Sequence, residues 1–242
     1  MLIYKINIYT KFRLMPKKIV YALIPGKINS QAVHQKNLQK IKNRSLIEIA
    51  IDGAKKSKLI DYVYVSSESL IVQNICKKKK VLYFKRNKKF STPRASSAQV
   101  VSEFIEKNKI KNNDVIIYLQ PTSPLRKTKH INEGLKLFTN KNCKSVISIK
   151  KVDIDIFKCV TLKSKKTKAI FQEKYMTSNR QSFPDYYEPN GAIYIFLVKD
   201  FLNKKRIPTS DCYPYLMNEK DSTDIDSYSD LKEARKYFLK KY

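Results

Sequence analysis

The chain has 242 residues, 42% of them hydrophobic, which is enough to bury a full core in one large α/β domain or two small ones. The formal net charge is +29, but the lysines are scattered and form one run only, at 77–80, so compositional bias is favoured over a nucleic-acid surface. The four cysteines lack metal-site or disulfide spacing and no apolar run could span a membrane, so we expect a cytoplasmic protein with reduced thiols.

Residues 1–17 are expected to form an N-terminal extension, with Met15 as an alternative start, because no continuous apolar region or cleavage site of a signal peptide is present. After it, buried strands are expected at 18–24, 62–65, 81–84, 114–119 and 145–149. Helices are expected between them, at 45–56, 69–78, 96–108 and 128–138. The first helix has Ser45 as N-cap and Glu48 as its capping-box partner. This alternation predicts an α/β fold with a doubly wound, mostly parallel sheet.

The alternation fails at 150–187, where short, polar and aromatic strand-like pieces predict a strand-rich excursion that forms a hairpin or contacts a partner. A core strand follows at 192–196, and an amphipathic helix at 226–242 closes the chain. One face of that helix is expected to contain Leu231, Ala234, Tyr237 and Phe238. No repeat or linker divides the sequence, so 18–242 is expected to be one domain.

Two loops follow expected strands, at the edge where open α/β sheets bind ligands. Residues 119–126 have the sequence Leu-Gln-Pro-Thr-Ser-Pro-Leu-Arg. These residues alone fit two explanations equally well, a turn that takes part in a ligand site and a rigid turn that only ends a strand. Residues 24–37 can place backbone N–H groups, a hydroxyl and lysines around a polyphosphate. They lack the glycine pattern of a P-loop, so a solvated basic loop is the alternative.

Other candidates lie near the end of the chain. Asp224 and Asp226 alternate in an extended segment, so both carboxylates can reach one magnesium ion. Asp153 and Asp155 have the same pattern, and Asp226 also suits a helix N-cap, so these residues alone leave the question open. Arg180 is suited to a substrate carboxylate, or is an ordinary surface arginine.

His34 and His130 have no neighbouring catalytic partner in the sequence. We expect both to be surface or turn residues and not catalytic bases.

Taken in order, these segments resemble the CMP-N-acylneuraminate cytidylyltransferases, which activate sialic acids and other nonulosonic acids, from about residue 19 to residue 237. Residues 119–126 match the family's Leu-Gln-Pro-Thr-Ser-Pro-Leu-Arg motif at every position. Residues 26–37 align without a gap with its Ala-Arg-x-x-Ser-Lys-x-x-x-x-Lys-Asn loop. The motifs at 180–181, 190–194 and 222–231 follow at the right spacing.

The resemblance implies a Rossmann-like nucleotidyltransferase with Mg²⁺ as cofactor, working as a homodimer formed through the excursion. Its substrates would be CTP and an acidic nine-carbon sugar, and its products a CMP-sugar for lipopolysaccharide or capsule and pyrophosphate. The implied nucleotide-binding residues are Lys27, Asn29, Ser30, Lys36, Asn37, Arg86 and Ser96 or Ser97. The implied sugar contacts are Gln120, Thr122, Ser123, Arg180 and Asn190. Asp224 and Asp226 would bind the metal and, with Lys27 and Lys36, form the catalytic set.

The sequence departs from the family pattern in the phosphate loop. Lys27 replaces an arginine, which keeps the charge but loses the forked geometry, and Gln31 replaces a lysine, so one phosphate cation is missing. Further departures are His34, Glu68 and Pro93. Three functions therefore stay open: a cytidylyltransferase for a nonulosonic acid or a Kdo-type acid, a weakened or non-catalytic nucleotide-binding relative, and a nucleic-acid binder that uses the positive charge.

Overall fold

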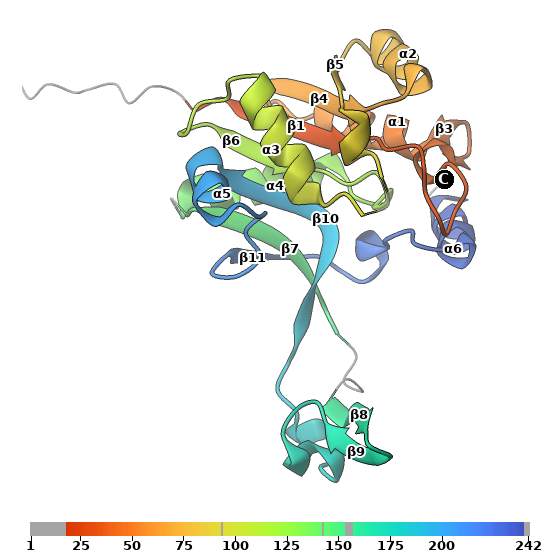
Figure 1. Ribbon diagram of the computed structural model, residues 1–242, viewed down its shortest axis with the longest axis vertical. Coiled ribbons are helices and arrows are strands. Elements are labelled where there is room, and N and C mark those ends of the chain that lie inside the picture. Colours follow the sequence, from red (N-terminus) through yellow and green to blue (C-terminus); the bar gives the residue numbers. More distant parts are fainter. Residues whose placement is uncertain (1–17, 93, 142, 153–156, 240–242) are drawn as a thin grey trace, which may run out of the picture.

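A computed structural model of the protein describes residues 18–239 apart from 93, 142 and 153–156. The expected extension at 1–17 with Met15, the pair Asp153 and Asp155, and Pro93 all lie outside the described residues. In the described part, a seven-stranded sheet has helices on both faces, and a smaller unit projects from the body (Figure 1).

The central sheet has the strand order β11-β7-β10-β6-β1-β4-β5. Its strands are β1 (Val20–Pro25), β4 (Tyr62–Ser67), β5 (Leu82–Lys85), β6 (Val115–Tyr118), β7 (Ser145–Lys151), β10 (Tyr187–Leu197) and β11 (Tyr213–Leu216). Neighbouring strands are parallel, except that β10 is antiparallel to both β6 and β7. The expected α/β class with a mostly parallel sheet is confirmed. The sequence does not predict β11, because it is a short edge strand whose side chains are mostly exposed.

Helices cover the two faces of this sheet, except that the last one packs against the first (Figure 1). They are α1 (Leu46–Lys55), α2 (Leu70–Lys79), α3 (Ser97–Lys107), α4 (Thr128–Asn140), α5 (Val198–Lys204) and α6 (Tyr228–Leu239). Short 3-10 helices are η1 (Lys36–Leu38), η2 (Lys88–Phe90), η4 (Glu173–Met176), η5 (Arg180–Ser182) and η6 (Lys220–Ser222). A two-stranded hairpin, β2 (Lys40–Ile41) and β3 (Arg44–Ser45), leads into α1.

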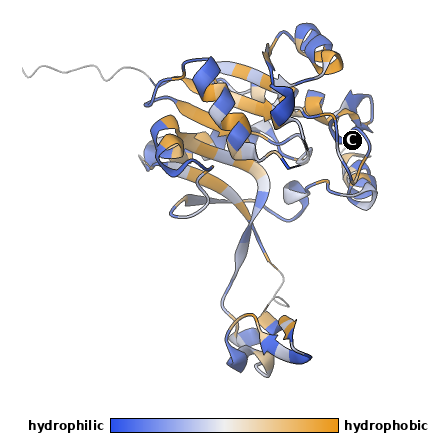
Figure 2. Ribbon diagram, viewed as in Figure 1, coloured by the Kyte–Doolittle hydropathy of each residue, from blue (hydrophilic) through white to orange (hydrophobic). Residues whose placement is uncertain are grey.

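Successive residues of the central strands enter two different cores. On β1, Ala22 and Ile24 belong to the cluster that includes residues of α1 and α4, whereas Leu23 packs in the cluster that includes residues of α3 and α5. Strands buried on both faces are continuous apolar runs, which is why the sequence predicts them well. Figure 2 shows the apolar residues concentrated on these strands.

Helix starts follow the local sequence closely. Ser45 and Glu48 form the expected capping box of α1, and Ser96 forms a second one with Gln99 at the start of α3. The last helix begins at residue 228, not at 226, because Ser227 and Asp230 bond each other across its first turn.

The apolar face of α6 is smaller than the sequence predicts. Leu231 and Ala234 are buried and Phe238 packs against them. Tyr237 is not part of this cluster, and its ring lies 5.1 Å from the Lys220 ammonium. Tyr237 faces Lys220 of η6 and not the apolar cluster.

The excursion at 150–187 is a separate small unit, reached through the outer parts of β7 and β10 (Figure 1). It contains the antiparallel hairpin β8 (Val160–Lys163) and β9 (Lys166–Ala169). The buried ring of Phe157 contacts four aromatic side chains, Phe171, Tyr175, Phe183 and Tyr186. This is the strand-rich excursion that the sequence predicts, and its role in dimerisation stays a prediction.

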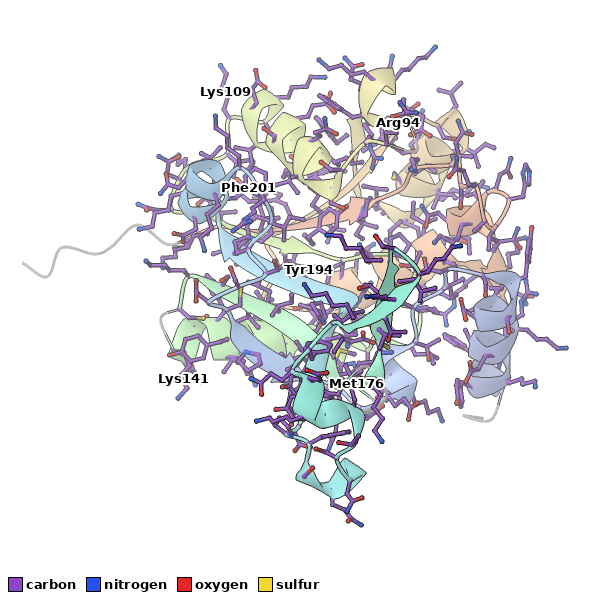
Figure 3. All side chains as sticks on the ribbon, turned by 60° about the horizontal axis from the view of Figure 1, so that its bottom comes forward. Arg94, Lys109, Lys141, Met176, Tyr194 and Phe201 are labelled. Carbon is purple, nitrogen blue, oxygen red and sulfur yellow. The ribbon has the colours of Figure 1, made fainter. Side chains whose placement is uncertain are left out.

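Basic side chains project from both faces of the body, including Lys109 after α3 and Lys141 after α4 (Figure 3). This is the distribution that compositional bias produces. Within the described part of the chain, no helix is long and apolar enough to cross a bilayer.

Candidate active site

The predicted site residues meet at one edge of the sheet. Strands β1, β4, β5 and β6 end there, and because β10 is antiparallel its first residues lie at the same edge. A cavity of about 370 Å³ opens at this edge. The predicted residues that line it are Lys27, Asn29, Ser30, Lys36, Asn37, Arg86, Ser97, Gln120, Thr122, Asp224 and Asp226. Loops that are far apart in the sequence are thereby brought to one place.

The loop after β1 is fixed by side chains around it. The Asn37 amide donates to the Lys27 carbonyl oxygen at 2.8 Å, and the Ile28 N–H donates to Glu68 Oε1 at 3.0 Å. The Lys27 ammonium donates to the Thr92 carbonyl oxygen at 3.3 Å. Burial lowers the pKa of Lys27, and the nearby Arg86 guanidinium lowers it further. Asn37 therefore acts on the shape of the loop, while Lys27 supplies charge to the cavity.

Two carboxylates of different character lie across the cavity from this loop. Asp226 is exposed, and its Oδ1 is 3.1 Å from the Lys36 ammonium. Asp224 is largely buried, and burial, followed by repulsion from Asp226, raises its pKa against the opposing hydrogen bond from Thr122.

One carboxylate oxygen of Asp224 and Asp226 lacks a hydrogen-bond partner. Asp224 Oδ1 is buried and has no hydrogen-bond partner, and such an anionic oxygen is costly to leave unpaired. A hard divalent cation shared with Asp226 would satisfy it. Among the described residues no group of three His, Cys, Asp or Glu side chains is placed to bind a metal, so water and substrate oxygens would complete the coordination, as Mg²⁺ prefers.

Another part of the cavity lining is apolar and aromatic, and consists of Phe90, Ala95, Val100 and Tyr118. Arg86 reaches it from the end of β5. Arg86 is 4% exposed, and its guanidinium donates from Nε to the Ser66 hydroxyl at 3.0 Å and from a terminal nitrogen to the Ser66 carbonyl at 2.7 Å. Burial lowers the pKa of Arg86, although its surroundings still favour the charged form. A fixed cation therefore lies between the polar and apolar ends.

Ser96 and Ser97 differ in their position relative to the cavity. The Ser96 hydroxyl accepts from the Gln99 N–H as the cap of α3, and Ser96 does not line the cavity. Ser97 lines it, and its hydroxyl accepts from the buried Tyr118 hydroxyl at 3.1 Å. Of the two alternatives that the sequence leaves open, only Ser97 is placed to contact a ligand.

The turn at 119–126 is fastened to β10 by Arg126, a residue to which the sequence gives no role. One terminal nitrogen of its buried guanidinium donates to the carbonyl oxygens of Gln120, at 2.8 Å, and Ala192, at 2.7 Å. Burial lowers the pKa of Arg126 to about 10, against the attraction of Asp224. Ser123 lies inside this turn, 1% exposed, and does not line the cavity.

Gly191 lies between two predicted ligand-binding side chains. Its φ is +74°, and a Cβ there would be 2.7 Å from Gln120 Oε1 and 3.1 Å from Asp224 Oδ2. Only glycine fits this backbone and this space. Gln120 and Asp224 therefore approach each other across a position without a side chain.

Asn190 is engaged within the protein. Its Oδ1 accepts from the Ser148 hydroxyl at 2.6 Å and the Ala192 N–H at 3.1 Å, and its amide nitrogen donates to the Ser222 hydroxyl at 2.8 Å. These bonds make it a residue that fixes the site, and its contact with the sugar stays a prediction. Arg180 lies in η5 of the excursion, its side chain is outside the described part, and its role also stays a prediction.

The expectation that His130 lies at the surface is wrong. It is 8% exposed, in the first turn of α4, with Nε2 3.5 Å from Asp221 Oδ2. A histidine three residues after a helix N-cap has no sequence signal for burial, because the residues that cover it come from η6, some 90 positions later. His34 is exposed in a turn, as expected.

A second hollow of about 470 Å³ lies on the side of the excursion and shares Asp224 and Asp226 with the first. Its lining includes Lys150, Glu188 and Lys220. The two carboxylates thus stand between two adjacent spaces, which suits a reaction between two bound molecules.

Comparison with known proteins agrees with this geometry. The family model described as "Cytidylyltransferase" matches residues 21–241. N-acylneuraminate cytidylyltransferase of Streptococcus agalactiae serotype III is 29% identical over 211 residues, covering 86% of this chain and 51% of the relative. Pseudaminic acid cytidylyltransferase of Campylobacter jejuni serotype O:2 is 26% identical, and the match covers 88% of this chain and 93% of the relative. CMP-N,N'-diacetyllegionaminic acid synthase of Legionella pneumophila is 25% identical, and the match covers 86% of this chain and 91% of the relative. The chain spans about half the length of the streptococcal relative.

Solved structures share the fold at low sequence identity. A CMP:2-keto-3-deoxy-manno-octonic acid synthetase complexed with CTP superposes with a TM-score of 0.70 at 14% identity, covering 93% of this chain and all of that one. A 4-diphosphocytidyl-2C-methyl-D-erythritol synthase superposes with a TM-score of 0.64 at 13% identity, and the match covers 92% of this chain and 99% of that one. The chain thus shares the fold of these two enzymes.

Replacing Gly191 by alanine should destabilise the protein, by about 1–2 kcal/mol from the left-handed backbone alone and by more from the contacts with Gln120 and Asp224. Gly53→Ala is the matched control, since a Cβ there would have its nearest neighbour at 3.9 Å. In the interior of α1 this change should stabilise by up to about 1 kcal/mol. Urea unfolding of both variants measures the difference, and equal effects would contradict the assignment of Gly191.

Proposed function

The chain belongs to the cytidylyltransferase family, and on that premise we propose that it transfers CMP from CTP to the anomeric hydroxyl of a sialic-acid-like nonulosonic acid. The observation that carries the proposal is the meeting of Asp224 and Asp226 with Lys27, Lys36 and Arg86 around one cavity. The S. agalactiae, C. jejuni and L. pneumophila relatives are all named for nonulosonic acids, which supports this class of acceptor. A CMP-sugar of this kind serves the building of surface glycans.

The two ends of the cavity suit the two parts of a nucleotide. The triphosphate fits the end with Lys27, Lys36 and the loop after β1, because the ammonium groups and backbone N–H groups there can neutralise and bind phosphate oxygens. The base fits the apolar end beside Phe90 and Tyr118. Arg86, fixed by Ser66, lies where the nucleoside would be oriented.

Asp224 and Asp226 would bind Mg²⁺, with the unpaired Asp224 Oδ1 as the strongest reason. The ion, when bound, neutralises phosphate charge and acidifies the attacking hydroxyl. Lys36 is paired with Asp226 in the free protein, so it is placed to turn to the phosphates once that carboxylate is engaged.

The acceptor would occupy the second hollow, on the other side of the two carboxylates. Lys150 and Lys220 line this hollow beside six carboxylates, and Lys150 is paired with Glu188 at 3.1 Å. The carboxylate of an acidic sugar would therefore depend mainly on Arg180 and on a cation held by Asp224 and Asp226. The anomeric oxygen attacks the α-phosphorus in line, the bond from that phosphorus to the bridging oxygen breaks, pyrophosphate leaves with the electron pair, and the hydroxyl proton passes to solvent. The protein acts mainly by positioning and charge neutralisation.

Pyrophosphate release tests this function. The protein is incubated with CTP, Mg²⁺ and one acid at a time from a panel of N-acetylneuraminic, legionaminic, pseudaminic and Kdo acids. We expect release with at least one nine-carbon acid and less with Kdo. No release with any acid, while CTP still binds, would leave the non-catalytic nucleotide-binding alternative.

Asp224→Asn should lower kcat by about 100- to 1,000-fold, the usual effect of losing one group that stabilises transition-state charge. The side chain keeps its size, so the free energy of unfolding should change little or rise, because a buried charge with an unpaired oxygen is removed. Steady-state kinetics at saturating CTP give the measurement. Asp52→Asn, in an ion pair with Lys79 on α1 and α2, is the control and should leave kcat unchanged.

Gln31→Lys should lower the KM for CTP by about two- to fivefold, the worth of one exposed ion pair, because Gln31 lines the phosphate end of the cavity. The gain should disappear at high salt, since exposed charges are screened. Asn74→Lys adds the same charge on the exposed side of α2 and should leave KM unchanged. Equal effects of the two substitutions would mean that position 31 does not face the phosphates.

We also propose that the excursion joins two copies of the chain into a homodimer. Apolar side chains on it are open to solvent, among them Val160, Leu162, Ile170 and Phe171, with Leu162 79% exposed. Apolar groups gathered on a projecting unit are typical of an interface.

Leu162→Glu should therefore shift the protein toward the monomer, because a carboxylate would have to be buried at the interface. Light scattering coupled to size-exclusion chromatography gives the mass. The control is Leu202→Glu on α5, where an equally apolar but less exposed residue lies on the body. A wild type that is monomeric at micromolar concentration, or a Leu162→Glu variant that stays dimeric, would contradict this interface.

A further inference from the structure

The segment at 218–226, which carries Asp224 and Asp226, has little regular structure of its own. It contains the one-turn helix η6 and lies between β11 and α6. Its backbone contact with the turn at 119–126 is the Ile225 N–H donating to the Thr122 carbonyl oxygen at 2.9 Å. The position of the Asp224 carboxylate therefore depends on side-chain bonds along this segment.

The strongest of these bonds are made by Asp221, three residues before Asp224. Asp221 is 4% exposed. Its Oδ2 accepts from the Lys127 ammonium at 2.7 Å and from the Asn218 amide at 2.9 Å, and His130 Nε2 lies at 3.5 Å. The Lys127 N–H donates to His130 Nδ1 at 3.2 Å, so the imidazole proton is on Nε2, facing the carboxylate. Asp221 is thus anchored to the first turn of α4.

This anchor is continuous with the turn that contacts the ligand. Lys127 directly follows Arg126, which is bonded to the Gln120 and Ala192 carbonyl oxygens. Ser222, next to Asp221, accepts from Asn190 on β10. The anchor and the Asn190 bond therefore fix the segment from two sides immediately before Asp224.

We propose that Asp221, Lys127 and His130 are positioning residues that fix the Asp224 carboxylate for cation binding. None of the three lines either cavity that contains Asp224, so they act through the segment and not on the ligand. The inference rests on the proposed function, because it assumes that Asp224 binds Mg²⁺ together with CTP. Side chains that orient metal ligands commonly affect metal affinity by about 10- to 100-fold.

The test compares the affinity for CTP in excess Mg²⁺ with that in EDTA, by calorimetry. The dissociation constant in EDTA divided by that in Mg²⁺ measures how much the metal increases the affinity for CTP, and this ratio is called the gain below. Asp221→Asn should reduce this gain about tenfold while leaving the affinity in EDTA unchanged. Lys127→Met should do the same, and the double variant should lose no more than either single one, because both changes break one ion pair.

Two matched controls separate positioning from general loosening. Asp52→Asn removes a half-buried carboxylate that is bonded to Lys79 at 2.9 Å and makes no bond to the segment, and Lys129→Met removes a lysine two positions from Lys127 with a weak exposed pair. Both should keep the wild-type gain. If Asp221→Asn does not fold, Asn218→Ala removes one bond to Asp221 Oδ2 and should reduce the gain by a smaller factor.

An unchanged gain in Asp221→Asn and Lys127→Met, with a normal wild type, would overturn this inference alone. So would an equal loss of affinity with Mg²⁺ and in EDTA, because that is the effect of a loosened structure. A wild type whose CTP affinity does not respond to Mg²⁺ would overturn the metal role in the proposed function, and the inference with it.

Discussion

The buried guanidinium of Arg126 joins the turn at 119–126 to β10, and the arrangement of the site depends on that connection. One nitrogen bonds the carbonyl oxygens of Gln120 and Ala192, residues that are 72 positions apart. Through it, the Gln120 side chain is held against Gly191, and Asp224 approaches the same glycine. An arginine buried in this way must satisfy several of its donors to offset its desolvation, so two strand ends and a turn are fixed together.

The antiparallel course of β10 decides where the excursion lies. Strand β7 ends at the edge that carries the cavity, and β10 begins there. The chain between them must therefore leave and return at this edge, and the excursion projects from the side of the second hollow (Figure 1). A fully parallel sheet would place the start of β10 at the opposite edge. The same feature that supplies Asn190 and Gly191 to the site also places the excursion next to it.

The sequence predicts the parts of the molecule whose signals are local. The doubly buried strands are apolar runs, and the capping box of Ser45 and Glu48 lies within four residues. Prediction from sequence fails where the contact of a side chain comes from far along the chain. His130 is buried by η6, and Tyr237 turns toward Lys220. The alternative of Asp226 as the N-cap of α6 is also excluded, because Ser227 takes that place and Asp226 pairs with Lys36. The family motif at 119–126 supplies residues that line the cavity, but the contact of Arg126 with β10 is one that no local pattern reveals.

The altered phosphate loop is best understood from the charges that surround it. Lys27, Lys36 and Arg86 line one cavity, and Arg86 and Lys36 both lower the pKa of Lys27, after its burial. Asp226 compensates Lys36, and Glu68 attracts Lys27 and Arg86. Another lysine at position 31 would add repulsion in the free protein and attraction only once a triphosphate is bound. On the proposed function, Gln31 would lower the affinity for the triphosphate and also lower the repulsion among the cations of the loop, and product release would have less attraction to overcome.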